Sequence, residues 1–165
     1  MVPMDEDISR RAKQYAMRFG ITLDRRLGFG KDGTVWETNR HTALKIFRES
    51  DPFRREISAY DRLAERGILD VNGHRVPQVE RVDQELLCLE MTIVQPPFVL
   101  DFASAYLDGT APEFPEDVME DWLARKQEEF GSDWPTAAGV LAALNRLGIH
   151  MTDVHPGNIC FRDDG

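Results

Sequence analysis

The sequence predicts an α+β protein whose first half is rich in strands and whose second half is helical. Residues 21–47 carry β-branched and aromatic side chains around a group of glycines, which is typical of an antiparallel meander. Two consecutive prolines break any continuing element, so residues 95–97 are the best linker. Apolar side chains then recur at helical spacing within residues 115–130 and again within residues 135–147.

The remaining segments complete the predicted order of elements. A first helix is expected before Gly20, because apolar residues recur at helical spacing there and acidic residues precede them. A second helix is expected over residues 51–66, and residues 76–79 and 86–91 are short strand candidates. The predicted organisation is therefore an N-terminal helix (1–20), a strand-rich lobe (21–94) and a helical lobe (95–165).

Length, charge and composition limit the class of protein. The 165 residues are 42% apolar and 30% charged, which is enough for a packed core. The formal net charge of −9, without a basic run, disfavours nucleic acid or an anionic membrane as a partner. The start lacks the features of a signal peptide, and no apolar stretch is long enough to span a bilayer. Cys88 and Cys160 match no metal spacing, so we expect a cytoplasmic protein with reduced thiols.

The segment LGFGKDGTV places Gly28, Gly30 and Gly33 between two predicted strands. A dinucleotide-binding fold would need a helix after the third glycine, whereas TVWET favours a strand. A P-loop would need Lys and then Ser or Thr after that glycine, which the sequence lacks. The remaining ligand-binding interpretation is a hairpin that covers phosphates, with Val35 covering a base. A glycine-rich turn without a ligand fits the same residues equally well.

Lys45 and Glu56 are charged residues at positions that the sequence pattern places among apolar side chains. On a strand, Lys45 shares one face with Ala43 and Phe47. On the following helix, Glu56 lies on the same apolar stripe as Tyr60. Because a buried carboxylate is costly unless it is paired, we predict an ion pair between Lys45 and Glu56. The pair would hold the ammonium towards whatever the glycine loop covers.

These residues, in this order, resemble the protein-kinase-like fold along about residues 21–165. Residues 28–35 resemble the glycine-rich loop, with Gly28, Gly30, Gly33 and Val35 as its members. Ala43 and Lys45 resemble the phosphate-contacting lysine strand, and Glu56 resembles the helical partner of that lysine. The strand LLCLEM resembles the one that enters the hinge. The resemblance implies Leu89 as gatekeeper, with the backbones of Glu90 and Thr92 at the adenine edge.

The segment GIHMTDVHPGNICF resembles a kinase catalytic loop of the small-molecule and atypical kinases. The resemblance implies that Asp153 orients the attacking hydroxyl and accepts its proton, and that Asn158 is a metal ligand. His155 replaces the lysine that eukaryotic protein kinases carry at this position, and it would either donate to the terminal phosphate or only pack. The implied fold is bilobal, with an antiparallel sheet plus one helix in the N-lobe and a minimal helical C-lobe. The implied cofactors are ATP and Mg²⁺.

The resemblance also implies a second metal-binding acid, in an Asp-Phe-Gly segment that follows the catalytic loop. The sequence ends before such a segment, so we expect a chain truncated ahead of it. Two functions then stay open: a phosphotransferase that is weak or dependent on a partner, or a pseudokinase that serves as a nucleotide-binding or structural interaction module. We also expect uncovered apolar side chains to form an interface in a homodimer or with a protein partner. These side chains are Trp122, Trp134, Leu141 and Leu144.

Overall fold

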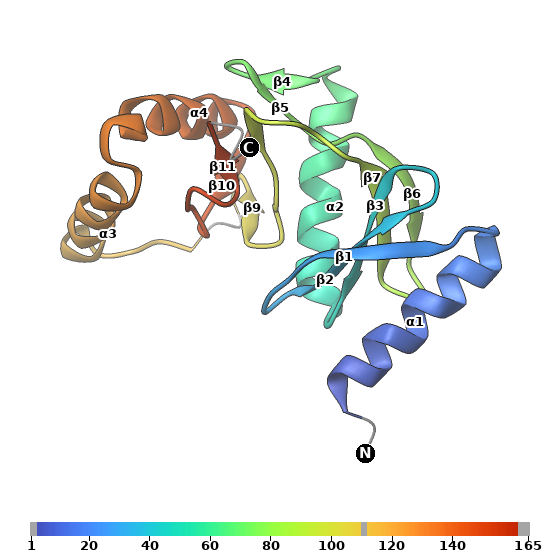
Figure 1. Ribbon diagram of the computed structural model, residues 1–165. Helices are drawn as coiled ribbons and strands as arrows, with labels where there is room; N and C mark the ends of the chain where they lie inside the picture. The colour runs from blue at the N-terminus through green and yellow to red at the C-terminus, as the bar shows by residue number, and fades with distance from the viewer. Residues whose placement is uncertain (1–2, 110–111, 162–165) are drawn as a thin grey trace.

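The computed structural model describes residues 3–109 and 112–161 and has a two-lobed α+β architecture (Figure 1). The N-lobe is built on an antiparallel sheet, and the C-lobe combines helices with short strands. Helix α2 stands between the sheet and the short strands of the C-lobe (Figure 1). The predicted α+β fold class, with an antiparallel sheet in one lobe and helices in the other, is therefore confirmed. None of the helices in these residues is long and apolar enough to cross a membrane.

The N-lobe sheet has five strands in the order β1-β2-β3-β7-β6, and every neighbouring pair is antiparallel. The order departs from the chain order because helix α2 and the hairpin of β4 and β5 intervene between β3 and β6. The sheet strands are β1 (Leu23–Phe29), β2 (Gly33–Thr38), β3 (Thr42–Phe47), β6 (Val79–Asp83) and β7 (Cys88–Thr92). The intervening elements are α2 (Ser50–Glu65), β4 (Asp70–Val71) and β5 (His74–Arg75).

The two faces of β3 enter two different hydrophobic clusters. Leu44 and Ile46 are fully buried in a cluster with apolar residues of α1 (Met4–Phe19). Ala43 and Phe47 point to the opposite face and belong to the cluster that contains residues of α2 and the C-lobe. This alternation is the one predicted from the sequence, and it places Lys45 on the face towards α2.

The C-lobe begins with two short strands that the sequence did not predict. Strand β8 pairs antiparallel with β11 and parallel with β5, and β9 pairs antiparallel with β10. The turn between β8 and β9 therefore lies beside the loop of residues 152–158, which joins β10 to β11. The C-lobe elements are β8 (Phe98–Val99), β9 (Ala105–Leu107), α3 (Glu116–Phe130), a 3-10 turn (Gly131–Asp133), α4 (Trp134–Arg146), β10 (Ile149–Met151) and β11 (Ile159–Cys160).

The predicted helices are present with ends within a residue or two, whereas one predicted strand is displaced. The strand expected over residues 76–79 runs instead from Val79 to Asp83. Pro77 explains the shift, because proline has no N–H to donate to a ladder. The expectation that Leu144 lacks cover is wrong, since this residue is fully buried in the main core. Trp122, Trp134 and Leu141 remain only partly buried.

Candidate active site

Lys45 lies at the centre of a buried group of charges. Its Nζ donates to Oε2 of Glu56 at 2.8 Å and to Oδ1 of Asp101 at 3.2 Å. Lys45 is 6% exposed and Glu56 is 1% exposed, so the pair is shielded from water. The ion pair predicted from the sequence is confirmed. A second carboxylate joins it, from a segment to which the sequence had given no role.

The charges around Lys45 keep its ammonium protonated. Burial alone lowers the pKa of Lys45, but the charges of Glu56 and Asp101 outweigh burial, and the pKa is raised above its ordinary value. Burial also raises the pKa of Glu56, against the opposing effect of Lys45. The Lys45 ammonium is therefore a fixed cation at neutral pH.

Asp101 reaches Lys45 from the turn between β8 and β9. Its backbone has a φ of 68°, in the left-handed region that few residues other than Gly, Asn and Asp adopt. Helix α2 holds the next residues of the turn. Arg55 Nε donates to the carbonyl of Ala103 at 2.9 Å, and the ring of Phe102 meets that of Tyr60 edge-on at 5.2 Å. The position of Asp101 is thus fixed by the same helix that supplies the partner of the buried lysine.

The loop between β10 and β11 carries the predicted residues Asp153, His155 and Asn158. Asn158 is buried; its Nδ2 donates to the Asp153 carbonyl at 2.6 Å, and its Oδ1 accepts from the His155 N–H at 3.1 Å. The N–H of Gly157 donates to Nδ1 of His155 at 3.0 Å, so the neutral imidazole carries its proton on Nε2. This Nε2 lies 3.8 Å from Oδ2 of Asp153, whose side chain is 40% exposed. Asn158 thus fixes the shape of the loop through its two hydrogen bonds, and the Asp153 carboxylate stays accessible.

The turn of Asp101 and the loop of residues 152–158 are joined at both ends. The N–H of Leu100 donates to the carbonyl of Asn158 at 2.9 Å. At the other end, Oγ1 of Thr152 donates to the carbonyl of Ser104 at 2.7 Å. The two segments are therefore neighbours in space, although the turn precedes the loop in the chain by the length of helices α3 and α4.

A cavity of about 260 Å³ lies between the lobes and ends at Lys45. Strands β1, β2 and β3 provide one wall, and the segment that follows β7 provides another. The cavity is mostly apolar, with the charged side chains gathered at one end, which suits a flat ring with a charged extension. The lining residues that the sequence analysis had singled out are Val35, Ala43, Lys45, Glu56 and Thr92.

Leu89 and Glu90, which the resemblance places as gatekeeper and at the adenine edge, do not line the cavity. Both are buried within β7 between its two neighbouring strands, and neither contributes to the cavity. The Glu90 carboxylate faces α1 instead and accepts hydrogen bonds from Tyr15 Oη at 2.8 Å and Thr42 Oγ1 at 2.7 Å. Strand β7 continues to Thr92, and the first of its residues to border the cavity is Met91, one residue after Glu90. The residues that border it are Met91, Thr92, Ile93 and Val94.

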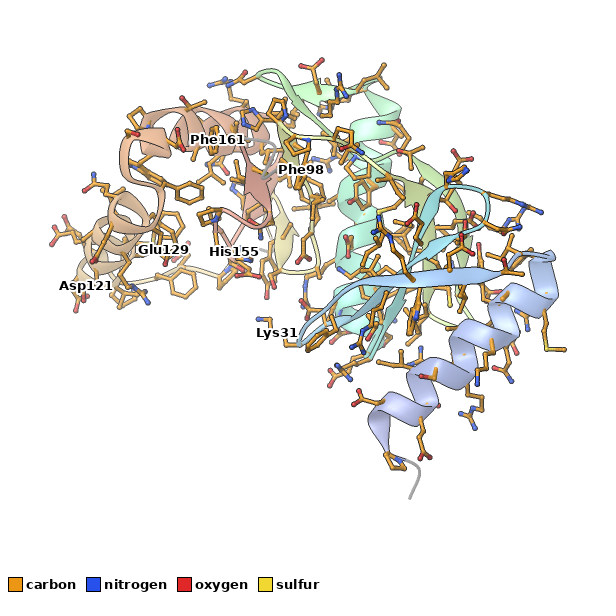
Figure 2. The ribbon with its side chains drawn as sticks, in the orientation of Figure 1. Lys31, Phe98, Asp121, Glu129, His155 and Phe161 are labelled. Carbon is orange, nitrogen blue, oxygen red and sulfur yellow. The ribbon has the colours of Figure 1, made fainter. Side chains whose placement is uncertain are left out.

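The three glycines of the β1–β2 hairpin differ in whether the surrounding structure has room for a side chain. A Cβ added to Gly33 would lie 2.0 Å from the carbonyl oxygen of Ile46, so the close approach of β2 to β3 demands glycine. At Gly28 and Gly30 an added Cβ would meet no atom of the described residues within 4 Å. Figure 2 shows Lys31 at the tip of this hairpin. Packing explains only Gly33, and the other two glycines leave room for a ligand to approach the backbone.

The oxygen donors at this site fit a magnesium ion that arrives with a nucleotide. In residues 3–109 and 112–161, no group of three or more His, Cys, Asp and Glu side chains could hold a metal. Magnesium bound with phosphates needs only one or two protein carboxylates, because phosphate and water oxygens complete its octahedron. Asp101 offers a partly exposed carboxylate, and Asn158, on the adjoining segment, offers an amide oxygen that is buried and already accepts the His155 N–H. This donor set is hard enough for magnesium and too small to hold the metal alone.

Sequence reasoning missed Asp101 although the sequence contained a signal. Asp101-Phe102-Ala103 differs from an Asp-Phe-Gly segment by one methyl group. An Asp-Phe-Gly segment was expected after Asn158, whereas this tripeptide precedes the loop of residues 152–158. Lys126 was also missed, and no pattern in the sequence indicated its role. Its Nζ donates to the Val154 carbonyl and thereby anchors helix α3 to the loop.

Comparisons with known proteins add only a limited likeness to solved structures. No protein-family model and no curated protein matches the sequence. Among solved structures, the chain is similar to one described as the streptomycin-ATP-APH(2")-IIa ternary complex, with 16% sequence identity and a TM-score of 0.43. The match covers 95% of this chain and 43% of that chain, so this chain spans less than half of the matched one. The resemblance to the protein-kinase-like fold is therefore argued from the strand order and the contacts around Lys45, and not from this likeness.

Proposed function

We propose that the protein is an ATP-binding phosphotransferase that moves a phosphoryl group from MgATP to a hydroxyl group. One observation carries the proposal: Lys45 Nζ lies between Glu56 and Asp101 at the charged end of an apolar cavity. One carboxylate is enough to neutralise the ammonium. The second gives these three side chains a net negative charge, which suits a divalent cation that accompanies phosphates.

The cavity supplies positioning for a nucleotide. Apolar side chains of the sheet and of residues 93–94 would enclose the base, as the shape and lining of the cavity suggest. Gly28 and Gly30 would let the hairpin backbone approach the phosphates, and Lys45 would hold non-bridging oxygens. Phosphoryl transfer depends chiefly on such positioning and on neutralisation of charge, so these contacts match what the reaction requires.

Asp153 is the proposed base. Its partly exposed carboxylate would orient the attacking hydroxyl and accept its proton. The Nε2–H of His155 faces this carboxylate from 3.8 Å and would help to orient it or would donate to the terminal phosphate. Asp101 and Asn158 would hold magnesium, which neutralises charge on the phosphate oxygens. The oxygen of Asn158 that would bind it also accepts the His155 N–H, so the loop stays ordered with or without a ligand.

The pseudokinase alternative rested on the expected absence of a second metal-binding acid. Asp101 offers a carboxylate beside the lysine, on a turn held against the catalytic loop. This observation favours the phosphotransferase over a module that only binds a nucleotide or a partner protein.

The test is a titration with ATP, with and without magnesium, that follows the melting temperature and ATP consumption. Binding should raise the melting temperature by mass action, more with magnesium than without it. Lys45→Ala should abolish the shift, and Asp153→Asn should keep the shift while losing turnover. Asp121→Asn, on the outer side of α3 (Figure 2), is the matched control and should behave as wild type. No shift under any condition would overturn the proposal, and equal turnover in Asp153→Asn would remove Asp153 as the base.

A further inference from the structure

A second and larger cavity opens within the C-lobe. Its volume is about 560 Å³, within the range of about 300–1,000 Å³ typical of sites for small molecules. Helices α3 and α4 and strand β10 form its walls. Trp122 and Trp134 meet edge-on in the wall, with ring centroids 6.1 Å apart, and Met119 and Leu141 extend the apolar surface. Aromatic and aliphatic walls of this kind favour an apolar ligand over a highly hydrated one.

This cavity adjoins the catalytic loop. Met151 and Thr152 contribute to its lining, and Thr152 directly precedes Asp153 in the chain. Thr152 is held in place by its hydrogen bond to the Ser104 carbonyl, and Lys126 ties α3 to the Val154 carbonyl. The wall that would contact a ligand therefore includes Thr152, the residue directly before the proposed base Asp153.

The charged groups of this cavity favour an anion. No carboxylate from the described residues lines it, whereas Arg125, Asn145 and His150 do. His150 is already engaged with Asp108 through Nε2. In the part of the chain that the structure describes, Arg125 is exposed and forms no ion pair, so its guanidinium is available to a carboxylate or a phosphate. A cationic ligand would find no counter-charge in the lining.

We propose, on the basis of the phosphotransferase function above, that this cavity is the acceptor site. The acceptor class is an apolar small molecule, most simply an aromatic one, that carries a hydroxyl and an anionic group. The hydroxyl oxygen attacks the terminal phosphorus of ATP, the phosphorus–oxygen bond to ADP breaks, and the hydroxyl proton passes to Asp153. The products are ADP and a phosphate monoester. Arg125 binds the anionic group and sets specificity without taking part in the chemistry.

The probes are three naphthols that share the ring and the hydroxyl but differ in charge. They are 6-hydroxy-2-naphthoate, 2-naphthol and 6-(aminomethyl)-2-naphthol. The sequence has three tryptophans, and Trp36 on β2 is outside the cavity, so Trp36→Phe leaves the two cavity tryptophans as fluorescence reporters. The naphthoate should bind about tenfold more tightly than 2-naphthol, as one charge-assisted hydrogen bond allows. The ammonium compound should bind most weakly.

Two variants and a matched control locate the binding. Arg125→Gln should reduce affinity for the naphthoate to the level of 2-naphthol and leave 2-naphthol binding unchanged. Ala142→Phe should weaken all three probes at least tenfold, because Ala142 lines the cavity. Ala124→Phe introduces the same ring at an exposed position of α3 outside the cavity lining and should leave all affinities unchanged.

Several results would overturn the acceptor site. These are an absence of fluorescence change with every probe, equal affinity for the ammonium and carboxylate compounds, or unchanged binding in Ala142→Phe. A wild-type protein that is dimeric by light scattering, and monomeric as Ala142→Phe, would assign the surface to a second copy of the chain. The MgATP-induced shift in melting temperature separates the two proposals. Ala142→Phe should keep the full shift, whereas a wild-type protein without that shift would refute the phosphotransferase alone.

Discussion

Asp101 Oδ1 and Lys45 Nζ are 3.2 Å apart, although one belongs to the C-lobe turn after β8 and the other to strand β3 of the N-lobe. Glu56 already satisfies the ammonium at 2.8 Å, so Asp101 is not needed to neutralise it. The Asp101 side chain is 30% exposed, whereas that of Glu56 is 1% exposed. The two carboxylates therefore differ in accessibility, and only Asp101 is open to a further cation.

Asp101→Asn should separate nucleotide binding from magnesium use. The amide keeps the size of the side chain but removes the charge that would hold a divalent cation. We expect ATP alone to stabilise the variant as it does wild type, while the additional stabilisation by magnesium is lost and turnover falls by about 10²–10³. The measurement is a melting curve with ATP, with and without magnesium, together with an assay of ATP consumption. An unchanged effect of magnesium would contradict the assignment, and Asp121→Asn is the control.

The contrast between Glu56 and Asp101 also explains what the sequence could predict. A strand and a helix each placed one charge on an apolar stripe, so the Lys45–Glu56 pair followed from local periodicity. Asp101 depends instead on the pairing of β8 with β11, and each of these strands has only two residues. Such short strands leave no periodic pattern, and the pairing joins segments on either side of two helices. No local reading of the sequence places Asp101 beside the catalytic loop.

The surroundings of Glu90 could not be predicted from the sequence, for a different physical reason. The resemblance set its register, and the strand ends at Thr92, one residue beyond the predicted end at Met91. The buried Glu90 side chain is stabilised by Tyr15 and Thr42, and Tyr15 belongs to the N-terminal helix. Because that helix packs on the opposite face of the sheet from α2, its contribution could not be inferred from the motif residues.

Removing one partner of the buried Lys45–Glu56 pair should destabilise the protein, whereas replacing both partners with apolar residues should be tolerated. Removal of Lys45 leaves Glu56 as an uncompensated buried charge, so Lys45→Met should lower the free energy of unfolding by about 3–5 kcal/mol. Glu56→Leu leaves Lys45 paired with Asp101, so its loss of stability should be smaller. The double variant removes both charges and should be more stable than either single variant. Urea unfolding of all four proteins gives the interaction free energy from the double-mutant cycle. Additive losses in the double variant would show that the pair contributes no coupling.

The hairpin glycines should fall into two classes. Gly33→Ala forces a methyl group against the Ile46 carbonyl and should lower the free energy of unfolding by about 1–3 kcal/mol. Gly30→Ala meets open space and should change stability by no more than about 0.5 kcal/mol, but it should weaken ATP binding because the backbone becomes less approachable. Urea unfolding and ATP titration measure the two effects. A loss of stability in Gly30→Ala as large as that in Gly33→Ala would contradict this division.

Tyr15 should make stability fall at high pH. Burial, with the hydrogen bond and charge of Glu90, raises the pKa of the Tyr15 phenol well above its ordinary value. Above about pH 10 the unfolded chain loses this proton while the folded protein keeps it. The folded state then binds more protons, so the free energy of unfolding falls as pH rises, by about 1.4 kcal/mol per pH unit for one proton. Below pH 10 both states hold the proton, and this contribution to stability is fully present.

Tyr15→Phe should therefore be less stable than wild type at neutral pH and less sensitive to alkali. The loss at pH 7 should be about 1–3 kcal/mol, because the buried Glu90 carboxylate loses a hydrogen-bond donor. Above pH 10 the slope should be shallower by one proton, so the two stability curves converge. Thr42→Val is the matched control, since it removes the other donor to Glu90 without removing a titrating proton. It should lower stability at pH 7 and keep the wild-type slope, measured by urea unfolding between pH 7 and 11. Parallel curves for wild type and Tyr15→Phe would show that the phenol does not cause the alkaline loss.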